Sequence, residues 1–373
     1  MIIAAARVVT PTRVLAPGWV LVEGDRVADV GEGTPGRPAD VDLPEATLVP
    51  GFVDVHVHGG GGASFDAGTA HDAAAVTRAH LAHGTTTMLA SLVTATPERL
   101  LASVAELAAA SEDGVIAGLH LEGPWLSPKR AGAHDPALLT EPDPALLEAL
   151  LEAGRGQVRM VTLAPELPGG LDAVRRLVAA GVVAAIGHTE ATYDEARAAL
   201  DAGARVGTHL FNAMRPLHHR EPGPIAALLE RPDAYVELIA DGVHVHPAAL
   251  RLAAEAKPDR IVLVTDAMAA AAAADGDYRL GRMTVTVRDG VARLAEGGAI
   301  AGSTLTLAAA VRYAVQVAGL SLADAVRAAS STPAEMLGLQ GIGSLVPGHR
   351  ADLVVLDEQL DVQRVLHRGR WVT

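Results

Sequence analysis

The chain has 373 residues, half of them apolar and a fifth charged, which is typical of a folded globular protein and not of a disordered one. Its formal net charge of −14 excludes a general nucleic-acid or anionic-membrane surface, so an anionic substrate would need a local basic patch. The absence of cysteine excludes disulfides, thiolate metal ligands and cysteine nucleophiles. The N-terminus lacks a signal-peptide pattern, and no apolar run approaches the ~20 residues of a membrane span, so we expect a cytoplasmic protein.

The two ends of the chain share one pattern. Residues 1–50 contain short apolar runs broken by Gly and Asp turns, and residues 344–373 repeat this arrangement. Such runs predict antiparallel strands, but neither segment is large enough to bury a core alone. We therefore expect both termini to combine in one small β-sandwich domain.

Between them, residues 51–343 alternate runs rich in β-branched residues with amphipathic helical segments, several of which end in Gly. The strand-like runs are 51–58, 85–93, 115–123, 157–166, 182–189, 205–212, 235–242 and 260–268. Apolar strands separated by helices predict a parallel sheet, and eight repeats favour a closed (β/α)₈ TIM-like barrel over an open sheet. Residues 278–298 predict a β-hairpin insertion that turns at Asp289–Gly290.

Polar side chains end several predicted barrel strands, where the active sites of such barrels lie. Together these ends provide four histidines and two carboxylates: His56, His58, Glu122, His188, His209 and Asp266. His56 and His58 are two residues apart, so a strand directs both imidazoles to one face. A single histidine at a strand end is more often hydrogen-bonded or solvated than bound to a metal. Here a separate explanation of that kind would be needed for the polar residues on each of five strands. The pattern therefore predicts a metal centre with nitrogen and oxygen ligands, which would accept Zn, Fe, Mn or Co.

Other histidines receive other interpretations. His120 shares a strand face with Glu122 and is a rival ligand, for which we favour a supporting or packing role. His246, two residues past His244, is expected in a loop. Helical or terminal positions predict surface exposure for the remaining ones, His71, His80, His83, His349 and His367.

Six motifs occur in order along residues 50–308. They are PGFVDVHVHGGGG, GLHLEGPWLSPKRAGAHDP, IGHTEATYDEARAALDAGARVGTHLFNAMRPLHHREPG, ELIADGVHVHP, VLVTDAMAA and IAGSTLTL. Pieces such as HLEGP or TDAM are weak alone, whereas the ordered set is highly specific. Through these motifs the chain resembles the amidohydrolase superfamily, and within it the deacetylases of amino-sugar phosphates. The flanking β-segments are similar to the small domain of that family, so the resemblance covers nearly the whole chain.

The resemblance implies a metal-ligand set. Glu122, His188 and His209 match the ligands of the metal that the family's members share. His56 and His58 match ligands of a second metal, which Glu122 would bridge and which Asp266 would approach. Some members replace this pair and use one metal, so the resemblance implies one or two divalent ions per chain, with zinc as the first candidate.

The resemblance also implies a reaction, which is the hydrolysis of N-acetyl-D-glucosamine 6-phosphate to D-glucosamine 6-phosphate and acetate in amino-sugar catabolism and recycling. A metal lowers the pKa of a bound water toward ~7, and Asp266 would take the proton as the hydroxide attacks and deliver it to the leaving amine. His244 would hold the substrate near the reacting carbonyl. Contacts with the sugar and the phosphate would come from Ala133, His134, Asn212, Ala213, Arg220, Ile300, Ala301, Gly302 and Ser303. Family members form dimers, so we expect a homodimer whose partner chain contributes to the phosphate site.

Several alternatives share part of this pattern. Many superfamily members bridge two metals with a carboxylated lysine, but Lys129 and Lys257 lie in a loop and a helix-like segment, which disfavours a cyclic-amide hydrolase. A deaminase of adenosine or cytosine does not account for HLFNAMRPLHHR, whose basic end, 214–220, suits a sugar phosphate as well as a solvated loop. Deacetylation of N-acetylgalactosamine 6-phosphate stays open. A metal-binding barrel without catalysis also stays open, although Asp266 disfavours it.

Overall fold

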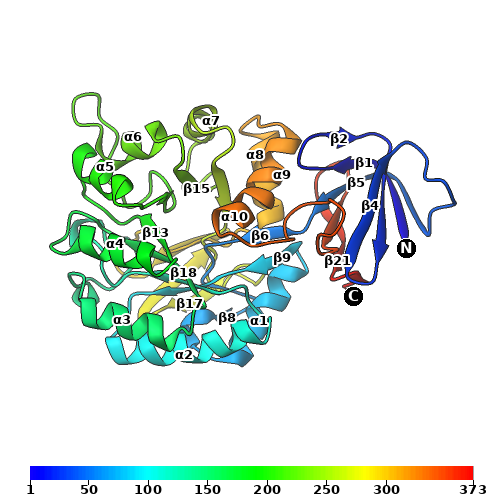
Figure 1. The fold of residues 1–373 in the computed structure, drawn as a ribbon. Coiled ribbons are helices and arrows are strands. Elements are labelled where there is room, and N and C mark those ends of the chain that lie inside the picture. Colours follow the sequence, from blue (N-terminus) through cyan, green and yellow to red (C-terminus); the bar gives the residue numbers. More distant parts are fainter. Residues whose placement is uncertain (373) are drawn as a thin grey trace.

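Short parallel strands form the centre of the larger body of the molecule in a computed structural model that describes residues 1–372 (Figure 1). Seven strands make one parallel sheet in the order β10–β11–β12–β13–β14–β15–β16. Their bounds are Ala90–Val93, Leu119–Glu122, Val158–Leu163, Val183–Ile186, Val206–Gly207, Tyr235–Ile239 and Ile261–Val264. Each lies within one of the runs that predicted it, so the alternation of apolar runs identified these strands correctly.

The first predicted run completes the ring. Strand β6 (Phe52–Asp54) pairs in parallel with β9 (Thr85–Met88), which continues into β10 after Leu89. A parallel bridge joins Val57, just after β6, to Ala267, just after β16. The first run therefore lies between the second and the eighth, as the predicted (β/α)₈ barrel requires.

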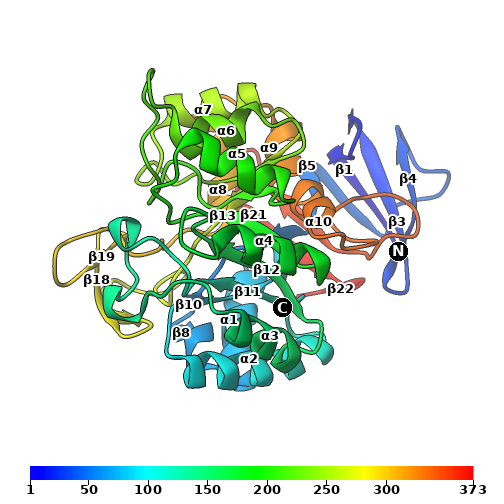
Figure 2. The same cartoon turned by 60° about the vertical axis from the view of Figure 1, so that its left-hand side comes forward.

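Helices follow the strands and cover the outside of the ring (Figures 1 and 2). They are α1 (Ala70–Leu81), α2 (Pro97–Glu112), α3 (Pro144–Ala153), α4 (Gly170–Ala179), α5 (Tyr193–Asp201), α6 (Gly223–Glu230), α7 (Pro247–Ala256), α8 (Leu307–Gln316), α9 (Leu322–Ala328) and α10 (Ser331–Met336). Hydroxyl side chains accept backbone N–H groups at the start of several of them, which fixes where each helix begins. These residues are Thr69, Thr96, Thr192, Thr306 and Ser321. Among the described residues, no helix is both long and apolar enough to cross a membrane.

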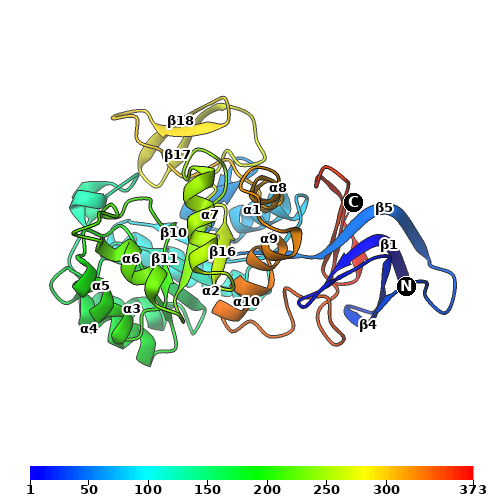
Figure 3. The same ribbon diagram turned by 90° about the horizontal axis from the view of Figure 1, so that it is seen from above.

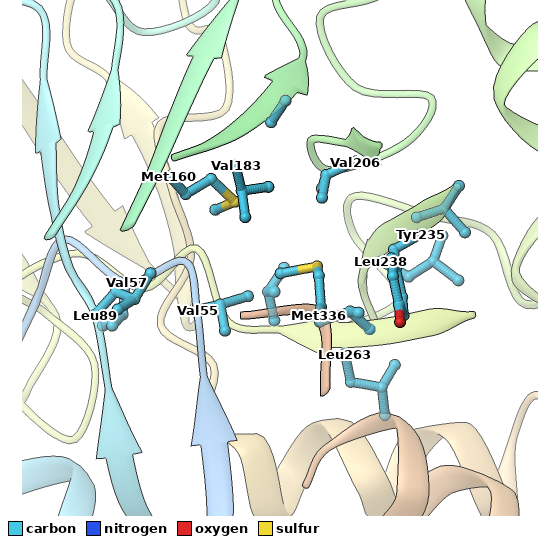
Figure 4. Close-up of a cluster of buried hydrophobic side chains, with 14 of the residues drawn as sticks. Val55, Val57, Leu89, Met160, Val183, Val206, Tyr235, Leu238, Leu263 and Met336 are labelled. Carbon is cyan, nitrogen blue, oxygen red and sulfur yellow. The ribbon is translucent and has the colours of Figure 1, made fainter. Parts of the chain in front are cut away.

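The barrel core is apolar and continuous. Buried side chains from several strands meet in it, among them Val55, Met160, Val206 and Leu263 (Figure 4). Val55 and Val57 belong to this core, and the alternation of a strand then directs His56 and His58 to the other face. The packing of two valines thus sets the orientation of the histidine pair.

Both termini contribute to a second sheet beside the barrel, as expected (Figure 1). Its order is β22–β21–β20–β5–β1–β3–β4, with β2 paired to β1. The bounds are β1 Ile2–Val9, β2 Val14–Leu15, β3 Gly18–Glu23, β4 Arg26–Glu32, β5 Val41–Pro50, β20 Leu353–Leu356, β21 Val362–His367 and β22 Arg370–Trp371. Two details add to the prediction: the strands are hydrogen-bonded into one continuous sheet that encloses its own apolar core, and β1 and β5 are parallel.

Alternating side chains attach this sheet to the barrel. On β20, Leu353 and Val355 face the core of the terminal sheet, whereas Val354 and Leu356 belong to the barrel core. Leu48 and Val49 of β5 divide in the same way. Both faces of these two strands are therefore buried, which favours continuous apolar runs over alternating ones. We propose that the division into two domains lies at residues 50 and 344, as expected from the sequence.

The predicted insertion is a three-stranded antiparallel sheet of β17 (Gly276–Leu280), β18 (Met283–Arg288) and β19 (Val291–Leu294). Figure 3 shows it projecting from one side of the barrel. Asp289 and Gly290 have φ values of 52° and 71°, the left-handed conformation that a tight hairpin turn requires. The apolar face of the insertion packs on Val93 and Met268, which follow or end barrel strands. This packing places the insertion beside the carboxyl ends of the strands.

Candidate active site

Five imidazoles and two carboxylates meet at the carboxyl ends of the barrel strands. All are buried, and six of the seven were predicted from the sequence as metal ligands. The predicted residues are His56, His58, Glu122, His188, His209 and Asp266, and the seventh is His134. The structure therefore brings together side chains from five strands and from the loop after β11.

Glu122, the last residue of β11, lies at the centre of the group. Its Oε1 is 3.1 Å from Nε2 of His188 and 3.0 Å from Nε2 of His209. These two Nε2 atoms are themselves 3.0 Å apart. The other carboxylate oxygen, Oε2, is 3.2 Å from Nε2 of His134. One carboxylate therefore contacts histidines on three sides.

The histidine pair of strand one completes the group from the opposite side. Nε2 of His56 and Nε2 of His58 are 3.1 Å apart. Nε2 of His58 is 3.3 Å from Oε2 of Glu122 and 3.2 Å from Oδ1 of Asp266. Nε2 of His56 is 3.5 Å from each of these two carboxylates. Glu122 thus lies between the pair and the other histidines, in the position of a bridging ligand.

This donor set fits divalent cations. Two pairs of imidazole nitrogens face each other at hydrogen-bond distance in a buried space, and two carboxylates face the same point. Ligand atoms within 4.8 Å of one another form two groups, one of His56, His58 and Asp266, and one of Glu122, His134 and His188. Nitrogen and oxygen ligands in this arrangement are those that zinc and its neighbours in the first transition row prefer.

The second ring nitrogen of each histidine indicates where its proton lies. Nδ1 of His58 faces the carbonyl oxygen of Ser91 at 3.2 Å, and Nδ1 of His188 faces that of Arg130 at 2.8 Å. Because a carbonyl only accepts, both Nδ1 atoms carry the proton and both Nε2 lone pairs are free for a metal.

His134 has the opposite pattern. The backbone N–H of Thr94 donates to its Nδ1 at 3.3 Å, so Nδ1 is an acceptor. In a neutral ring the proton is then on Nε2, which faces Glu122. Nδ1 is also 2.9 Å from the hydroxyl of Thr94, which can donate to it as well. In this tautomer His134 presents an N–H, and not a lone pair, to Glu122.

Three of the predicted ligands adopt a conformation that is uncommon for residues other than glycine. His188, His209 and Asp266 have φ values of 46°, 30° and 49°. Each follows the end of a barrel strand, and the left-handed backbone turns the chain away from the strand direction at that point. Such conformations cost of order 1–3 kcal/mol each and concentrate at functional sites.

Burial and neighbouring charges determine the pKa values in the site. Burial alone would raise the pKa of the Glu122 carboxyl, but His56 and His188 hold it well below its usual range. Burial, reinforced by His56, lowers the pKa of His120 well below the ordinary value. Both nitrogens of His120 are hydrogen-bonded, to Oγ of Ser91 at 2.9 Å and Oγ1 of Thr162 at 2.8 Å. His120 therefore supports the site as a neutral ring and offers no free nitrogen to a metal.

His244 lies at the edge of the site. Its Nδ1 is 2.6 Å from Oδ2 of Asp241, whose other oxygen accepts the backbone N–H of His244. Burial alone would lower the pKa of His244, but the Asp241 carboxylate raises it above the ordinary value. The ring is therefore fixed by Asp241 and favours its protonated form.

A cavity of about 330 Å³ opens above this group of side chains. Predicted substrate contacts that line it are Ala133, His134, Asn212, Ala213, His244, Ile300 and Gly302. Its walls also contain six residues that the sequence did not indicate as site residues: Val93, Lys129, Arg130, Gly132, Leu280 and Ala299. The cavity therefore contains polar groups at its base and cations at its rim.

Three predicted contacts lie outside this lining. Ala301 is fully buried in the core of the insertion, and the hydroxyl of Ser303 donates to the carbonyl oxygen of Thr265 at 2.6 Å. Arg220 is exposed, and its guanidinium contacts His219 at 2.8 Å. Within one chain, these side chains are used for packing or face solvent.

One other histidine prediction was wrong. His80 is fully buried and not at the surface, and its Nε2 donates to the carbonyl oxygen of Gly59 at 2.9 Å. His246 is an exposed loop residue, as predicted, and its side chain also accepts the N–H of Ala248 at the start of α7. The contact of His80 with a distant backbone carbonyl is not visible in the sequence pattern.

The sequence also missed Glu237. It lies inside β15, is fully buried, and its Oε2 is 3.0 Å from Nδ1 of His56. The signal in the sequence was a single carboxylate inside the apolar run YVELIA, residues 235–240.

Comparison with known proteins gives consistent relatives. Residues 47–372 match the amidohydrolase family. The N-acetylgalactosamine-6-phosphate deacetylase of Escherichia coli O157:H7 is 42% identical over 363 residues, which cover 95% of each chain. The N-acetylglucosamine-6-phosphate deacetylase of Vibrio furnissii is 39% identical over 342 residues, 90% of this chain and 86% of its own.

A solved structure is similar over the whole chain. It is N-acetyl-D-glucosamine-6-phosphate deacetylase from Mycobacterium smegmatis, an aspartate-to-alanine mutant in complex with N-acetyl-D-glucosamine-6-phosphate. It is 53% identical, has a TM-score of 0.98, and the match covers 100% of this chain and 99% of that one.

Proposed function

The chain belongs to the amidohydrolase family, and on that premise we propose that it removes the acetyl group from N-acetyl-D-glucosamine 6-phosphate. The products are D-glucosamine 6-phosphate and acetate, within amino-sugar metabolism. The observation that carries this proposal is the convergence of the imidazoles and carboxylates on Glu122 at the base of the cavity. An amide is a poor electrophile with a poor leaving group, and such a site supplies both Lewis acidity and proton transfer.

Divalent-metal dependence is general in the family, and two groups of candidate ligands are present in this chain. Glu122, His188 and His209 would hold one ion, and His56 with His58 would hold a second, close to Asp266. A bound divalent ion polarises a carbonyl group and makes a coordinated water more acidic. Of the metals that accept this ligand set, we propose zinc.

Asp266 is placed to move the proton. Its Oδ1 is 3.2 Å from Nε2 of His58, and the residue lines the cavity. It would accept the proton of the attacking water as the new C–O bond forms, and return it to the sugar nitrogen as the C–N bond breaks. The amine then leaves as a neutral group.

His244 and His134 would orient the acetamido group. Asp241 fixes the ring of His244 through Nδ1, and in the protonated ring a proton on Nε2 would be available to the acetyl carbonyl oxygen. His134 would donate from Nε2 to a polar group of the sugar. Both act as hydrogen-bond donors whose orientation is set before substrate arrives, which lowers the reorganisation needed in the transition state.

The phosphate needs positive charge in a chain of net charge −14. Arg220 is exposed and outside the cavity of its own chain, so we propose that it acts across a homodimer, on the cavity of the partner. Lys129 and Arg130 are the cations at the rim of the cavity. Arg130 is paired with Glu190 at 2.5 Å, which reduces its net charge. We further propose that the enzyme is cytoplasmic.

Acetate release from several sugars tests this proposal. N-acetyl-D-glucosamine 6-phosphate should be the preferred substrate, ahead of N-acetyl-D-galactosamine 6-phosphate and far ahead of unphosphorylated N-acetyl-D-glucosamine. The galactosamine compound is a specific second candidate, because a deacetylase of that sugar is 42% identical to this chain. A preference for N-acetyl-D-galactosamine 6-phosphate would change the proposed substrate but not the proposed reaction. Absence of acetate release from both sugar phosphates would contradict the proposed function.

A further inference from the structure

Glu237 is a buried carboxylate to which none of the roles above has been assigned. It lies in β15 beneath the candidate metal centre and is 0% exposed. Its Oε2 is 3.0 Å from Nδ1 of His56 and also accepts the backbone N–H of His209 at 3.1 Å. One carboxylate oxygen thus contacts a ligand from strand one and the backbone of a ligand from strand six.

Among the described residues, no lysine or arginine forms an ion pair with Glu237. Across residues 1–372, its only ion-pair partner is the imidazole of His56, and its Oε1 has no hydrogen-bond partner. A buried carboxylate without compensation costs several kcal/mol, so a positive charge close to His56 is needed to make this position favourable. A cation bound at Nε2 of His56 would supply it through the ring.

The candidate ligands differ in what holds their second nitrogen. His58 and His188 use neutral backbone carbonyls, those of Ser91 and Arg130. Nδ1 of His209 has no partner among the described residues. Only His56 of this set has a carboxylate there. A carboxylate fixes the Nδ1–H tautomer and makes Nε2 a stronger ligand than a carbonyl does.

We infer that Glu237 is a positioning residue for His56 and controls occupancy of the second metal position, that of His56, His58 and Asp266. Glu237 contacts the position of Glu122, His188 and His209 only through the backbone N–H of His209 and no ring nitrogen there, so we expect its charge to affect that position less. The two metal positions therefore differ in affinity because of Glu237, a residue that is not itself a metal ligand. This inference rests on the proposed metal-dependent function, but its test measures metal binding and not catalysis.

The test uses Glu237→Gln, which keeps the size of the side chain and an acceptor oxygen but removes the charge. Metal-free protein is titrated with Zn²⁺ against a chromophoric chelator, and the two dissociation constants are fitted. In Glu237→Gln one of the two constants, that of the position of His56, His58 and Asp266, should rise about 10–100-fold, the range typical for loss of a partner behind a ligand. The other constant should keep its wild-type value.

Asp54→Asn is the matched control. Asp54 is also 0% exposed and accepts the backbone N–H of His56 at 3.3 Å and Oγ1–H of Thr265 at 2.6 Å, but its carboxylate contacts no ring nitrogen. Its two zinc constants should remain those of the wild type. Should Glu237→Gln not fold, Glu237→Asp withdraws the carboxylate from Nδ1 and should weaken the same constant.

The inference would be overturned if both zinc dissociation constants of Glu237→Gln equalled those of the wild type, or if both rose equally. It would also be overturned if Asp54→Asn lost as much zinc affinity as Glu237→Gln. The absorption of Co²⁺-loaded protein is a second readout, since loss of one Co²⁺ removes its share of the visible bands. A wild-type protein that binds no divalent ion would instead contradict the proposed function itself.

Discussion

The backbone N–H of Thr94 donates to Nδ1 of His134, which leaves the proton of that ring on Nε2, 3.2 Å from Oε2 of Glu122. His134 lies as close to Glu122 as the candidate ligands do, and distance alone would place it among them. The hydrogen bond at Nδ1 distinguishes His134, which carries a proton on Nε2, from the candidate ligands, whose Nε2 lone pairs are free.

His134→Ala should therefore leave the metal content unchanged while lowering kcat by about 10²-fold, the effect of losing one preorganised donor. His134→Gln, which keeps an N–H donor, should recover part of the loss. His188→Ala is the contrasting variant, because it should lose metal. A metal deficit in His134→Ala, measured by elemental analysis per chain, would place His134 among the ligands.

Asp266→Asn removes the proposed proton acceptor at nearly constant shape. Turnover should fall by orders of magnitude, while binding of the sugar phosphate is retained, because the interaction matters mainly in the transition state. Single-turnover acetate release and equilibrium substrate binding together provide the measurement. Near-normal turnover in this variant would rule out Asp266 as the acid/base.

Arg220→Ala should reduce kcat/KM for the phosphorylated sugar far more than for N-acetyl-D-glucosamine, since only the former offers a phosphate. Lys129→Ala is a comparison and not a control, because Lys129 is a cation that lines the cavity of its own chain whereas Arg220 does not. Inactive Asp266→Asn chains mixed with Arg220→Ala chains should regain activity if Arg220 serves the partner's cavity. Equal losses on both sugars would mean that this basic stretch is not a phosphate site.

Asp241 should influence the pH dependence. Although burial opposes it, the Asp241 carboxylate raises the pKa of His244, and the negative charge of Asp266 acts in the same direction. Asp241→Asn removes one of these charges, so the protonated ring becomes less favourable and the pKa of His244 falls. The alkaline limb of the kcat/KM profile should therefore move to lower pH. An unchanged alkaline limb would show that His244 does not act in its protonated form.

Much of the site was predictable because barrel strands end in polar residues after apolar runs. His188 and Asp266 stand out in this way, and the spacing of two residues in the predicted strand 51–58 indicated that His56 and His58 share a face. In the structure β6 ends at Asp54, and the two Nε2 atoms still meet at 3.1 Å. The closed barrel followed from the same alternation of strands and helices. These features depend on local pattern and on one general property of the fold.

Other features depend on contacts between distant segments, which the pattern of one chain does not contain. Glu237 lies inside an apolar strand, and only the approach of His56, 181 residues away in sequence, gives it a role. His80 has the spacing of a surface helix residue but is buried under the loop at Gly59. Arg220 belongs to a basic stretch that suits a phosphate, yet the folded chain leaves it outside the cavity.

The central claim is that metal ions held around Glu122 allow this chain to deacetylate an amino-sugar phosphate. The most direct measurement is acetate release from N-acetyl-D-glucosamine 6-phosphate by protein stripped with a chelator and then reloaded with Zn²⁺. The account predicts that activity is lost on stripping and restored in proportion to the zinc bound per chain, and that Asp266→Asn stays inactive at full zinc content. Full activity in the stripped protein, or none at any metal content, would contradict it.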